Sequence, residues 1–464
     1  MDVIVQKSMP ARKNPDHDPF SCISPRMIDR LPASNPLPSQ VGVVVIGAGA
    51  AGIAAAQRLI RPGLSLLVLE ARNRLGGRAW TQRVEGEGLD MGCGWLHSAD
   101  DNVLAGRVEA EGLTLDQTPP PWRTQAFDHE MTPADQADFR QAFDAFDQRV
   151  SEAAALFRAG LGEDRPASDF FDPDGRWNAR IDAISGAMNG ARFAEVSSLD
   201  YDAYGDTGVN WRVREGYGRL IARLGEAVSG RVVLDCAVRR IDRSGPLLRL
   251  ETSRGELTAR AVILTVPNSL IATEAVRIDP PVPTLLEATA GVPLGLASKV
   301  HMTVRGAGDF QPDTQLWVRG DTAQTGGYHL RPFGRPMIEA YFGADLAWGL
   351  EAQGPAAVVD FAVSELVAAL GSDMRRRLEA VAVSGWGVDP WSRGACSHAL
   401  PGHAGDRAKL RGAVEDRIFL AGEATAPVYY GTAHGAWMEG ERAADAVLES
   451  LGLDPRRDDG DSEA

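Results

Sequence analysis

The sequence predicts an α/β fold that begins with a strand–helix–strand unit. Residues 41–46 form an apolar, β-branched run that is too short for most helices, which indicates a buried parallel strand. Residues 64–69 form a second such run, which ends in Glu70. Small residues at 53–59, between the two runs, are typical of a helix that packs closely on a sheet. Together these observations predict a parallel sheet of the Rossmann type.

Glycines join the first strand to the helix in the pattern G-x-G-x-x-G, with Ala51 inside the motif. Gly47 permits a tight turn, Gly49 lets backbone N–H groups approach a pyrophosphate, and Gly52 lets the helix approach the sheet. The helix N-terminus attracts the anion. Glu70 is placed to accept hydrogen bonds from an adenosine ribose. The alternative is a glycine-rich turn in an ordinary α/β fold, but the strand, helix and acid in register favour dinucleotide binding.

Composition limits the classes of function. The 464 residues can form about two or three domains, and the net charge of −15 disfavours nucleic acid, which binds a basic face. Cys22, Cys93, Cys236 and Cys396 have neither a metal-binding nor a disulfide spacing, so we expect no metal and a reducing, cytoplasmic location. No run reaches the roughly 18 apolar residues that would predict a membrane helix.

A second motif follows Glu70 directly. The segment from Ala71 and Arg72 to Gly77 and Arg78 contains the string R-x-x-x-G-G-R. This string resembles the second motif of the FAD-binding amine oxidase superfamily. The resemblance implies that FAD is the cofactor, that Ala71, Arg72 and Gly77 contact it, and that Arg78 stands near its flavin end. The alternative is a basic turn on the surface.

Two later segments extend this resemblance. Residues 89–97 resemble the D-x-G-x-x-W-x-H stretch of polyamine and spermine oxidases. The resemblance places Gly94 and Trp95 beside the flavin and His97 at the mouth of the substrate pocket. Residues 214–220 resemble the family's G-G-x-x-x-L segment, and Val238 then matches a position whose backbone meets the adenine.

Lys299 is the residue that the resemblance singles out for chemistry. It lies in residues 294–300, which resemble the family's G-x-x-x-K-V strand. In relatives this lysine holds a water molecule against flavin N5. A lysine among apolar residues would be costly to bury without a partner. The alternative is a lysine on an edge strand, exposed to solvent.

The stretch 386–397 resembles the family's W-x-x-x-P-x-S-x-G-x-Y-S segment at the face of the flavin, which begins here with Trp386. Ala395 stands where monoamine oxidases have the cysteine that links to flavin, so we expect noncovalent FAD. Cys396 stands where relatives have an aromatic residue of the amine-binding cage. A slip of one residue in the alignment would make Cys396 a covalent attachment site, which is the alternative.

The last motif spans a strand and the start of a helix. Residues 417–423 end in Gly422 and Glu423, and Glu423 suits ribityl or ribose hydroxyls. A helix over 437–451 follows, and the N–H groups at its start, near Thr432 and Ala433, suit the flavin pyrimidine carbonyl. Thr432 occupies the second cage position and is not aromatic. Candidates for a replacement wall of the substrate pocket are Tyr429, Tyr430, Trp386 and Trp391.

Two helices are predicted by local signals alone. Thr132, Pro133 and Asp135 form an N-terminal capping signature, and Gly160 predicts the end of that helix. Residues 355–371 predict a second helix with one apolar face. Residues 170–210 look irregular, with many Asp, Gly and aromatic residues.

The resemblance covers residues 41–451 and implies a glutathione reductase-like FAD-binding domain with an inserted α+β substrate domain. The implied reaction moves a hydride from a polyamine, or another secondary or primary amine, to flavin N5, giving an imine, and reduces O2 to H2O2. The alternatives are an amine dehydrogenase, a desaturase or porphyrinogen oxidase type of flavoprotein, and a nonenzymatic binding protein; a homodimer is left open. The expected divisions are an arm at 1–40 that is partly disordered, FAD-domain segments at 41–97, 212–280 and 405–453, substrate-domain segments at 98–211 and 281–404, and an acidic tail at 454–464.

Overall fold

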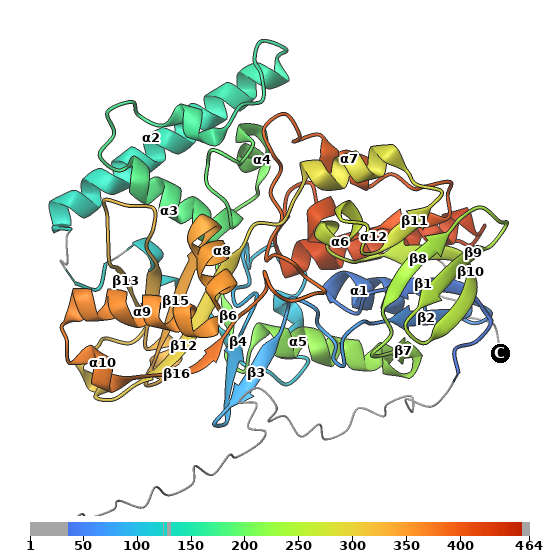
Figure 1. Ribbon diagram of the computed structural model, residues 1–464, viewed down its shortest axis with the longest axis horizontal. Helices are drawn as coiled ribbons and strands as arrows, with labels where there is room; N and C mark the ends of the chain where they lie inside the picture. The colour runs from blue at the N-terminus through green and yellow to red at the C-terminus, as the bar shows by residue number, and fades with distance from the viewer. Residues whose placement is uncertain (1–35, 124, 128–130, 457–464) are drawn as a thin grey trace, which may run out of the picture.

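The computed structural model describes residues 36–123, 125–127 and 131–456 as a mixed α/β molecule with two main sheets. In Figure 1 the larger sheet lies on the right and the smaller sheet on the left. This architecture confirms the predicted α/β class. Most of the predicted N-terminal arm and C-terminal tail lies outside the described residues.

The larger sheet has a parallel centre. β1 pairs in parallel with β2 and β10, while β7 and β17 extend the parallel set. β9 runs antiparallel between β8 and β10, and β11 adds to the edge of β8. The carboxyl ends of the parallel strands therefore lie along one edge of the sheet, and sheets of this kind bind ligands at that edge. The strands are β1 (Gln40–Ile46), β2 (Leu66–Leu69), β7 (Val232–Val233), β8 (Val238–Asp242), β9 (Leu248–Thr252), β10 (Gly255–Leu264), β11 (Arg277–Asp279) and β17 (Ile418–Leu420).

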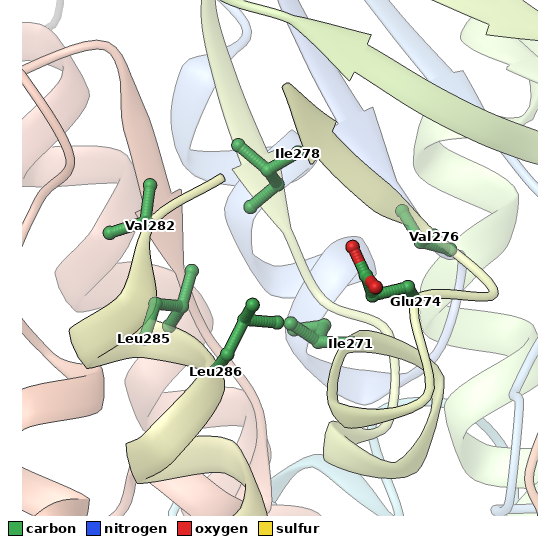
Figure 2. Close-up of a pocket in the computed structure, with 7 residues that line it drawn as sticks. All are labelled: Ile271, Glu274, Val276, Ile278, Val282, Leu285 and Leu286. Carbon is green, nitrogen blue, oxygen red and sulfur yellow. The ribbon is translucent and has the colours of Figure 1, made fainter. Parts of the chain in front are cut away.

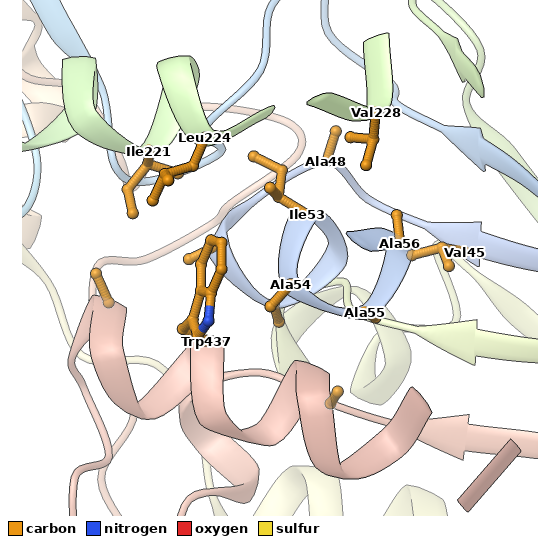
Figure 3. Packing of buried hydrophobic residues seen from close by; sticks show 14 of the residues in the cluster. Val45, Ala48, Ile53, Ala54, Ala55, Ala56, Ile221, Leu224, Val228 and Trp437 are labelled. Atoms are coloured by element: carbon orange, nitrogen blue, oxygen red, sulfur yellow. The ribbon is translucent and has the colours of Figure 1, made fainter. Parts of the chain in front are cut away.

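Helices cover both faces of this sheet, so the side chains of β1 alternate between two apolar cores. Val43 and Val45 face a core that Figure 3 shows, with α1 (Ala50–Leu59), α5 (Tyr217–Leu224) and α12 (Ala433–Ser450). Val44 and Ile46 face a second core with α6 (Asn268–Ala272), α7 (Pro283–Gly291) and α11 (Asp406–Leu410). Because both faces are covered, the central strands read as continuous apolar runs.

The smaller sheet is antiparallel. Its order is β13 (Thr314–Trp317), β14 (Gly327–Leu330), β15 (Met337–Gly343), β12 (Ala297–Val304) and β16 (Leu378–Val383). Val300 and Met302 of β12 pack in one core with α9 (Pro355–Leu370). Lys299 and His301 therefore face the opposite side of the sheet, because successive side chains alternate.

Helices flank this second sheet. α2 (Pro133–Arg158) has the predicted capping box: Asp135 N donates to Thr132 Oγ1 at 3.2 Å, and Thr132 N donates to Asp135 Oδ2 at 3.1 Å. The segment that looked irregular contains two helices, α3 (Asn178–Asn189) and α4 (Ser198–Ala203). Their polar, glycine-containing sequences have weak local patterns, and packing of Ile181 against the aromatic cluster around Phe146 stabilises α3. The remaining helices here are α8 (Ala344–Gln353) and α10 (Met374–Arg377).

Short elements connect the two halves. β3 (Thr81–Val84) and β4 (Glu87–Asp90) form a hairpin, and β5 (Leu115–Asp116) pairs antiparallel with β6 (Arg212–Val213), which lies far from it in the sequence. The 3₁₀ turns are η1 (Ala105–Arg107), η2 (Pro121–Arg123), η3 (Ala167–Phe170), η4 (Gly225–Arg231), η5 (Ala307–Asp309), η6 (Pro332–Gly334) and η7 (Glu423–Thr425).

Candidate active site

The glycine motif lies at the carboxyl end of β1, where it meets the end of β10. Gly47 has a φ of 106°, and a Cβ there would lie 2.5 Å from Thr265 Oγ1. A Cβ on Gly52 would lie 1.9 Å from Gly47 O, so glycine alone lets α1 begin this close to the strand. A Cβ built on Gly49 would be in ordinary contact with the second motif, 3.8 Å from Gly76 O and 3.9 Å from Gly77 Cα. The loop and the first turn of α1, including Ala51, form a backbone cradle for an anion.

The Glu70 side chain makes hydrogen bonds with the backbone of this cradle. Its side chain is buried; Oε2 accepts a hydrogen bond from Ala48 N at 2.7 Å and Oε1 accepts one from Arg72 N at 2.8 Å. Cys236 N donates to Glu70 O at 2.8 Å, just before Val238 begins β8. The structure thus brings three predicted cofactor residues, Glu70, Arg72 and Val238, to one place, with Ala71 between the first two.

The second motif connects the cradle to the C-terminal part of the chain. Gly76 N donates to Ala48 O at 2.8 Å, and the Cα of Gly49 would lie 3.3 Å from a Cβ on Gly77. Arg78 Nη1 then donates to Ala395 O at 2.6 Å and to Glu423 Oε1 at 2.8 Å. Three segments far apart in the sequence therefore meet at one arginine.

Glu423 is buried at the centre of this junction. Its Oε2 accepts hydrogen bonds from Ser397 Oγ at 2.6 Å and Gly431 N at 2.8 Å. Arg78 and the Ser397 hydroxyl lower the pKa of Glu423 despite its burial, so it is a carboxylate. Gly422 beside it has a φ of 149° and no atom within 4 Å of a Cβ built there. The carboxylate and the free space lie at the carboxyl end of β17, on the same edge as the cradle.

α12 points its N-terminus toward the same region. Thr432 caps the helix: its Oγ1 accepts a hydrogen bond from Gly435 N at 3.0 Å and donates one to Tyr429 O at 2.6 Å. The helix begins at Ala433, four residues before the predicted start, because Thr432 is its cap. The first N–H groups of a helix have no partner within it and carry partial positive charge.

These features fit a flavin dinucleotide. The free space beside Gly422 is space that a Cβ would fill, and two helices begin at the carboxyl edge of a parallel sheet. Backbone N–H donors and positive helix ends suit a pyrophosphate. The cradle of Gly47, Gly49 and Gly52 would therefore hold the phosphates, and the start of α12 would meet the flavin ring.

Lys299 lies where the smaller sheet faces the loop after β4. Its side chain is 9% exposed, and its Nζ is 3.1 Å from Glu339 Oε1 on β15. A Cβ on Gly94 would lie 3.2 Å from Lys299 Nζ, so the loop backbone approaches the ammonium group closely at this position. Burial acts to lower the pKa of Lys299, but Glu339 and Asp90 outweigh it and the pKa is raised. The lysine is therefore a buried ammonium ion, and not an exposed residue on an edge strand.

Two tryptophans frame the region around Lys299. Trp386 is buried, and its indole N–H donates to Met91 O at 2.8 Å, in the loop that leads to Gly94. Trp95 stacks on His329 with ring centroids 6.2 Å apart. His97 follows in the same loop, where its Nδ1 is 2.7 Å from Asn210 Oδ1 and burial lowers its pKa. A neutral His97 can donate or accept one hydrogen bond at its free nitrogen.

Cys396 and Tyr430 have different surroundings. Cys396 is half-buried; burial and nearby Glu423 raise the pKa of its thiol to about 12, so it is neutral and a poor nucleophile. Tyr430 is fully enclosed: its hydroxyl donates to Asp200 O and its ring lies 3.8 Å from the Arg407 guanidinium.

Sequence reasoning missed several residues that the structure places here. Tyr341 and Tyr204 are half-buried, and the Cys396 thiol adds to the rise of both their pKa values, so it lies near both. Glu339 and Tyr341 alternate with apolar residues along β15, and this alternation was the signal available in the sequence.

Two hollows among the described residues differ in their lining. One, of about 30 Å³, is polar and lies beside Lys299. Figure 2 shows the other, a hollow between α6, β11 and α7 that is lined by aliphatic side chains and Glu274. The first has the polar groups that catalysis needs and the second does not. The polar cavity is lined by Gly88, Leu89, Asp90, Gly94, Trp95, Arg212, Val213, Lys299, His301, His329, Pro332, Phe333, Arg335, Met337 and Glu339.

The described part of the chain has neither a membrane-spanning helix nor a cluster of metal ligands. No helix there is long and apolar enough to cross a membrane. Across residues 36–123, 125–127 and 131–456, no group of three or more His, Cys, Asp or Glu side chains could hold a metal ion. Cys93, Cys236 and Cys396 are free thiols.

Known proteins resemble this chain in sequence and in fold. Polyamine oxidase 4 of Oryza sativa subsp. japonica is 27% identical over 91% of each chain, and a lysine-specific histone demethylase 1 homolog 3 of Oryza sativa subsp. indica is 26% identical over 91% of this chain and 55% of that protein. A solved putrescine oxidase bound to putrescine has a TM-score of 0.72 at 22% identity, covering 88% of this chain and 99% of that one. Cyclohexylamine oxidase from Brevibacterium oxydans IH-35A has a TM-score of 0.70 at 20% identity, covering 89% and 99%.

The solved structures show a shared fold, and the family is shown by the match of the sequence itself. The family model described as flavin containing amine oxidoreductase matches residues 50–150 and 134–448. The two matched ranges include the second glycine motif, Lys299 and the start of α12. The chain is therefore an enzyme that belongs to the flavin-containing amine oxidoreductase family.

Proposed function

We propose that this protein is an FAD-dependent amine oxidase whose substrate is a polyamine or a related secondary amine. The observation that carries the proposal is the buried Lys299 ammonium, which lies against the glycine of a loop that also carries Trp95 and His97. The family match and the polyamine oxidase relatives support the amine as substrate. The flavin, when bound, accepts a hydride from the carbon next to the amine nitrogen and passes electrons to O2, which yields an imine and H2O2.

Noncovalent binding is part of this proposal. The backbone of Ala395 is already used as an acceptor by Arg78, and its methyl group cannot form a link to a flavin. The neutral thiol of Cys396 also argues against attachment there. The cofactor contacts would come from three FAD-domain segments, 41–97, 212–280 and 405–453, which supply the cradle, the Val238 strand and the start of α12.

The protein side chains orient the amine and leave its deprotonation to solvent. Lys299 and the residues around Trp386 would determine on which face of the flavin the amine carbon lies. A water molecule would bind to Lys299 Nζ. His97, Cys396, Tyr204 and Tyr341 would line the amine pocket. An ammonium ion cannot release a hydride readily, so the amine must react in its neutral form. We expect the rate constant for flavin reduction to rise with pH through the pKa of the amine; a rate that stays flat across that pKa would contradict this step.

An anaerobic titration tests the proposal. Purified protein is mixed with spermine, spermidine, an acetylated polyamine, a monoamine and an amino acid, and the visible absorbance of bound FAD is followed. Bleaching by a polyamine supports the proposal, and bleaching only by a monoamine keeps the reaction class but changes the substrate. A yellow protein that no amine bleaches would favour the desaturase type. Rapid bleaching followed by slow peroxide release in air would indicate a dehydrogenase.

A further inference from the structure

Glu339 makes the closest charged contact with Lys299. Its Oε1 lies 3.1 Å from Lys299 Nζ, and its other oxygen, Oε2, lies 3.7 Å from His301 Nδ1. Burial acts to raise the pKa of Glu339, but the positive charge of Lys299, with His301 and His329 nearby, outweighs it and lowers that pKa to about 2. The titratable groups that face Lys299 are Glu339 and Tyr341 from β15, His301 from β12, Asp90 from β4, and Cys93 and His97 from the loop after β4.

Asp90 is less able to balance the lysine charge, because its oxygens are already used. Its Oδ1 accepts hydrogen bonds from Thr81 Oγ1 at 2.5 Å and Gly218 N at 3.2 Å, and its Oδ2 accepts one from Tyr217 N at 2.9 Å. Burial raises the pKa of Asp90. Glu339 is therefore the carboxylate on which the charge of Lys299 depends. A buried ammonium ion without such a partner loses its proton readily, because burial disfavours the charged form.

The cavity beside Lys299 gives its proton a way to exchange. Its volume of about 30 Å³ is room for roughly two water molecules, and it is lined by Lys299, Glu339, His301, His329 and other polar groups. Because water can reach the lysine, its protonation follows the equilibrium that its neighbours set. Removing the Glu339 charge should therefore change the charge state of Lys299.

We propose that Glu339 is a positioning residue that keeps Lys299 protonated and fixed beside the flavin site throughout the working pH range. Lys299 then acts as a constant positive charge and not as a base. This inference rests on the proposed function, because Lys299 faces a flavin only if FAD binds in the cradle. The same Glu339 carboxylate also lies near His301, the next side chain of β12 that faces the site.

A spectroscopic titration without substrate tests the inference. The visible absorbance of FAD bound to the purified protein is recorded from pH 6 to pH 9 for the wild type, Glu339→Gln, Glu339→Asp and the double variant Lys299→Met/Glu339→Gln. We expect no lysine transition in the wild type. Glu339→Gln should gain a one-proton transition, Glu339→Asp should lack it, and the double variant should lose it again. The lack of a transition in Glu339→Gln, or its persistence in the double variant, would overturn the proposal.

Glu87→Gln is the matched control. Glu87 Oε2 pairs with Arg335 Nε at 2.7 Å on the wall of the same cavity. A guanidinium keeps its proton throughout this range, so this variant should titrate like the wild type. If Glu339→Gln binds no FAD, recovery of FAD binding in the double variant would support the proposal, and continued loss would overturn it. Wild-type protein that binds FAD but is bleached by no amine would contradict the proposed function and leave the titration interpretable.

Discussion

Glu70 links two loops through one buried carboxylate. It accepts hydrogen bonds from the backbone N–H groups of Ala48 and Arg72, one in each of the two glycine motifs. In Glu70→Ala both N–H groups would lose their acceptor, and each loss costs about 1–3 kcal/mol. We expect a free energy of unfolding lower by about 2–5 kcal/mol and a loss of most bound FAD, measured by urea unfolding and by the absorbance ratio at 450 and 280 nm.

Glu256→Ala is the control for Glu70→Ala. Glu256 lies on β10 of the same sheet, but its side chain is 58% exposed. This variant should keep wild-type stability and FAD content. Equal FAD content in the two variants would show that Glu70 does not organise the cradle. The sequence predicted Glu70 as a ribose ligand, and the structure adds its contacts with the loops, which spacing alone does not reveal.

Helices α1 and α12 approach each other through glycine. A Cβ on Gly440 of α12 would lie 2.1 Å from Ala51 O in the first turn of α1. Gly440→Ala would push apart two helices that both begin at the cofactor site, and overpacking of this kind costs about 1–3 kcal/mol. We expect a lower thermal midpoint and weaker FAD binding, measured by thermal denaturation with and without added FAD.

Gly349→Ala is the control for Gly440→Ala. Gly349 lies inside α8, and no atom is within 4 Å of a Cβ built there. Alanine is favoured over glycine in a helix by about 0.5–1 kcal/mol, so this variant should be slightly more stable with unchanged FAD binding. A loss of stability in both variants, or in neither, would contradict the role given to the α1–α12 contact.

Elements differ in how well the sequence predicted them. β1 and β2 are buried on both faces, and α2 carries its own capping signals, so local sequence was sufficient. β7 has only two residues and pairs with β2 at the edge of the sheet. α3 has no strong pattern and depends on contacts with α2 and β15.

At the scale of the whole molecule, the residues predicted for the cofactor edge belong to motifs, whereas several residues around Lys299 do not. The cradle is built from short, continuous segments, each with its own signature. Glu339 and Tyr341 reach Lys299 through the antiparallel register of β12 and β15, which pairs Lys299 with Tyr341. Such a register depends on residues about 40 positions apart, so a single sequence does not specify it.

Acid stability is a property of the whole molecule that two buried histidines should control. Burial lowers the pKa of His398 and of His434 to about 4. A histidine in the unfolded chain binds a proton below about pH 6.5, so the stabilisation is present above that pH and is lost as the pH falls from 6.5 toward 4. When the pH falls from 7 to 5, each histidine should lower the free energy of unfolding by about 2 kcal/mol.

Urea unfolding at pH 7 and pH 5 measures this effect in the wild type, His398→Gln and His434→Gln. From pH 7 to pH 5 the free energy of unfolding of each variant should fall by about 2 kcal/mol less than that of the wild type, because glutamine has no proton to bind. Glu339 does not contribute to this difference. Its pKa is about 2, so the stabilisation that it provides is lost only below about pH 4.5. An equal loss in all three proteins would show that neither histidine is held neutral by the fold, and that other groups determine how the protein responds to acid.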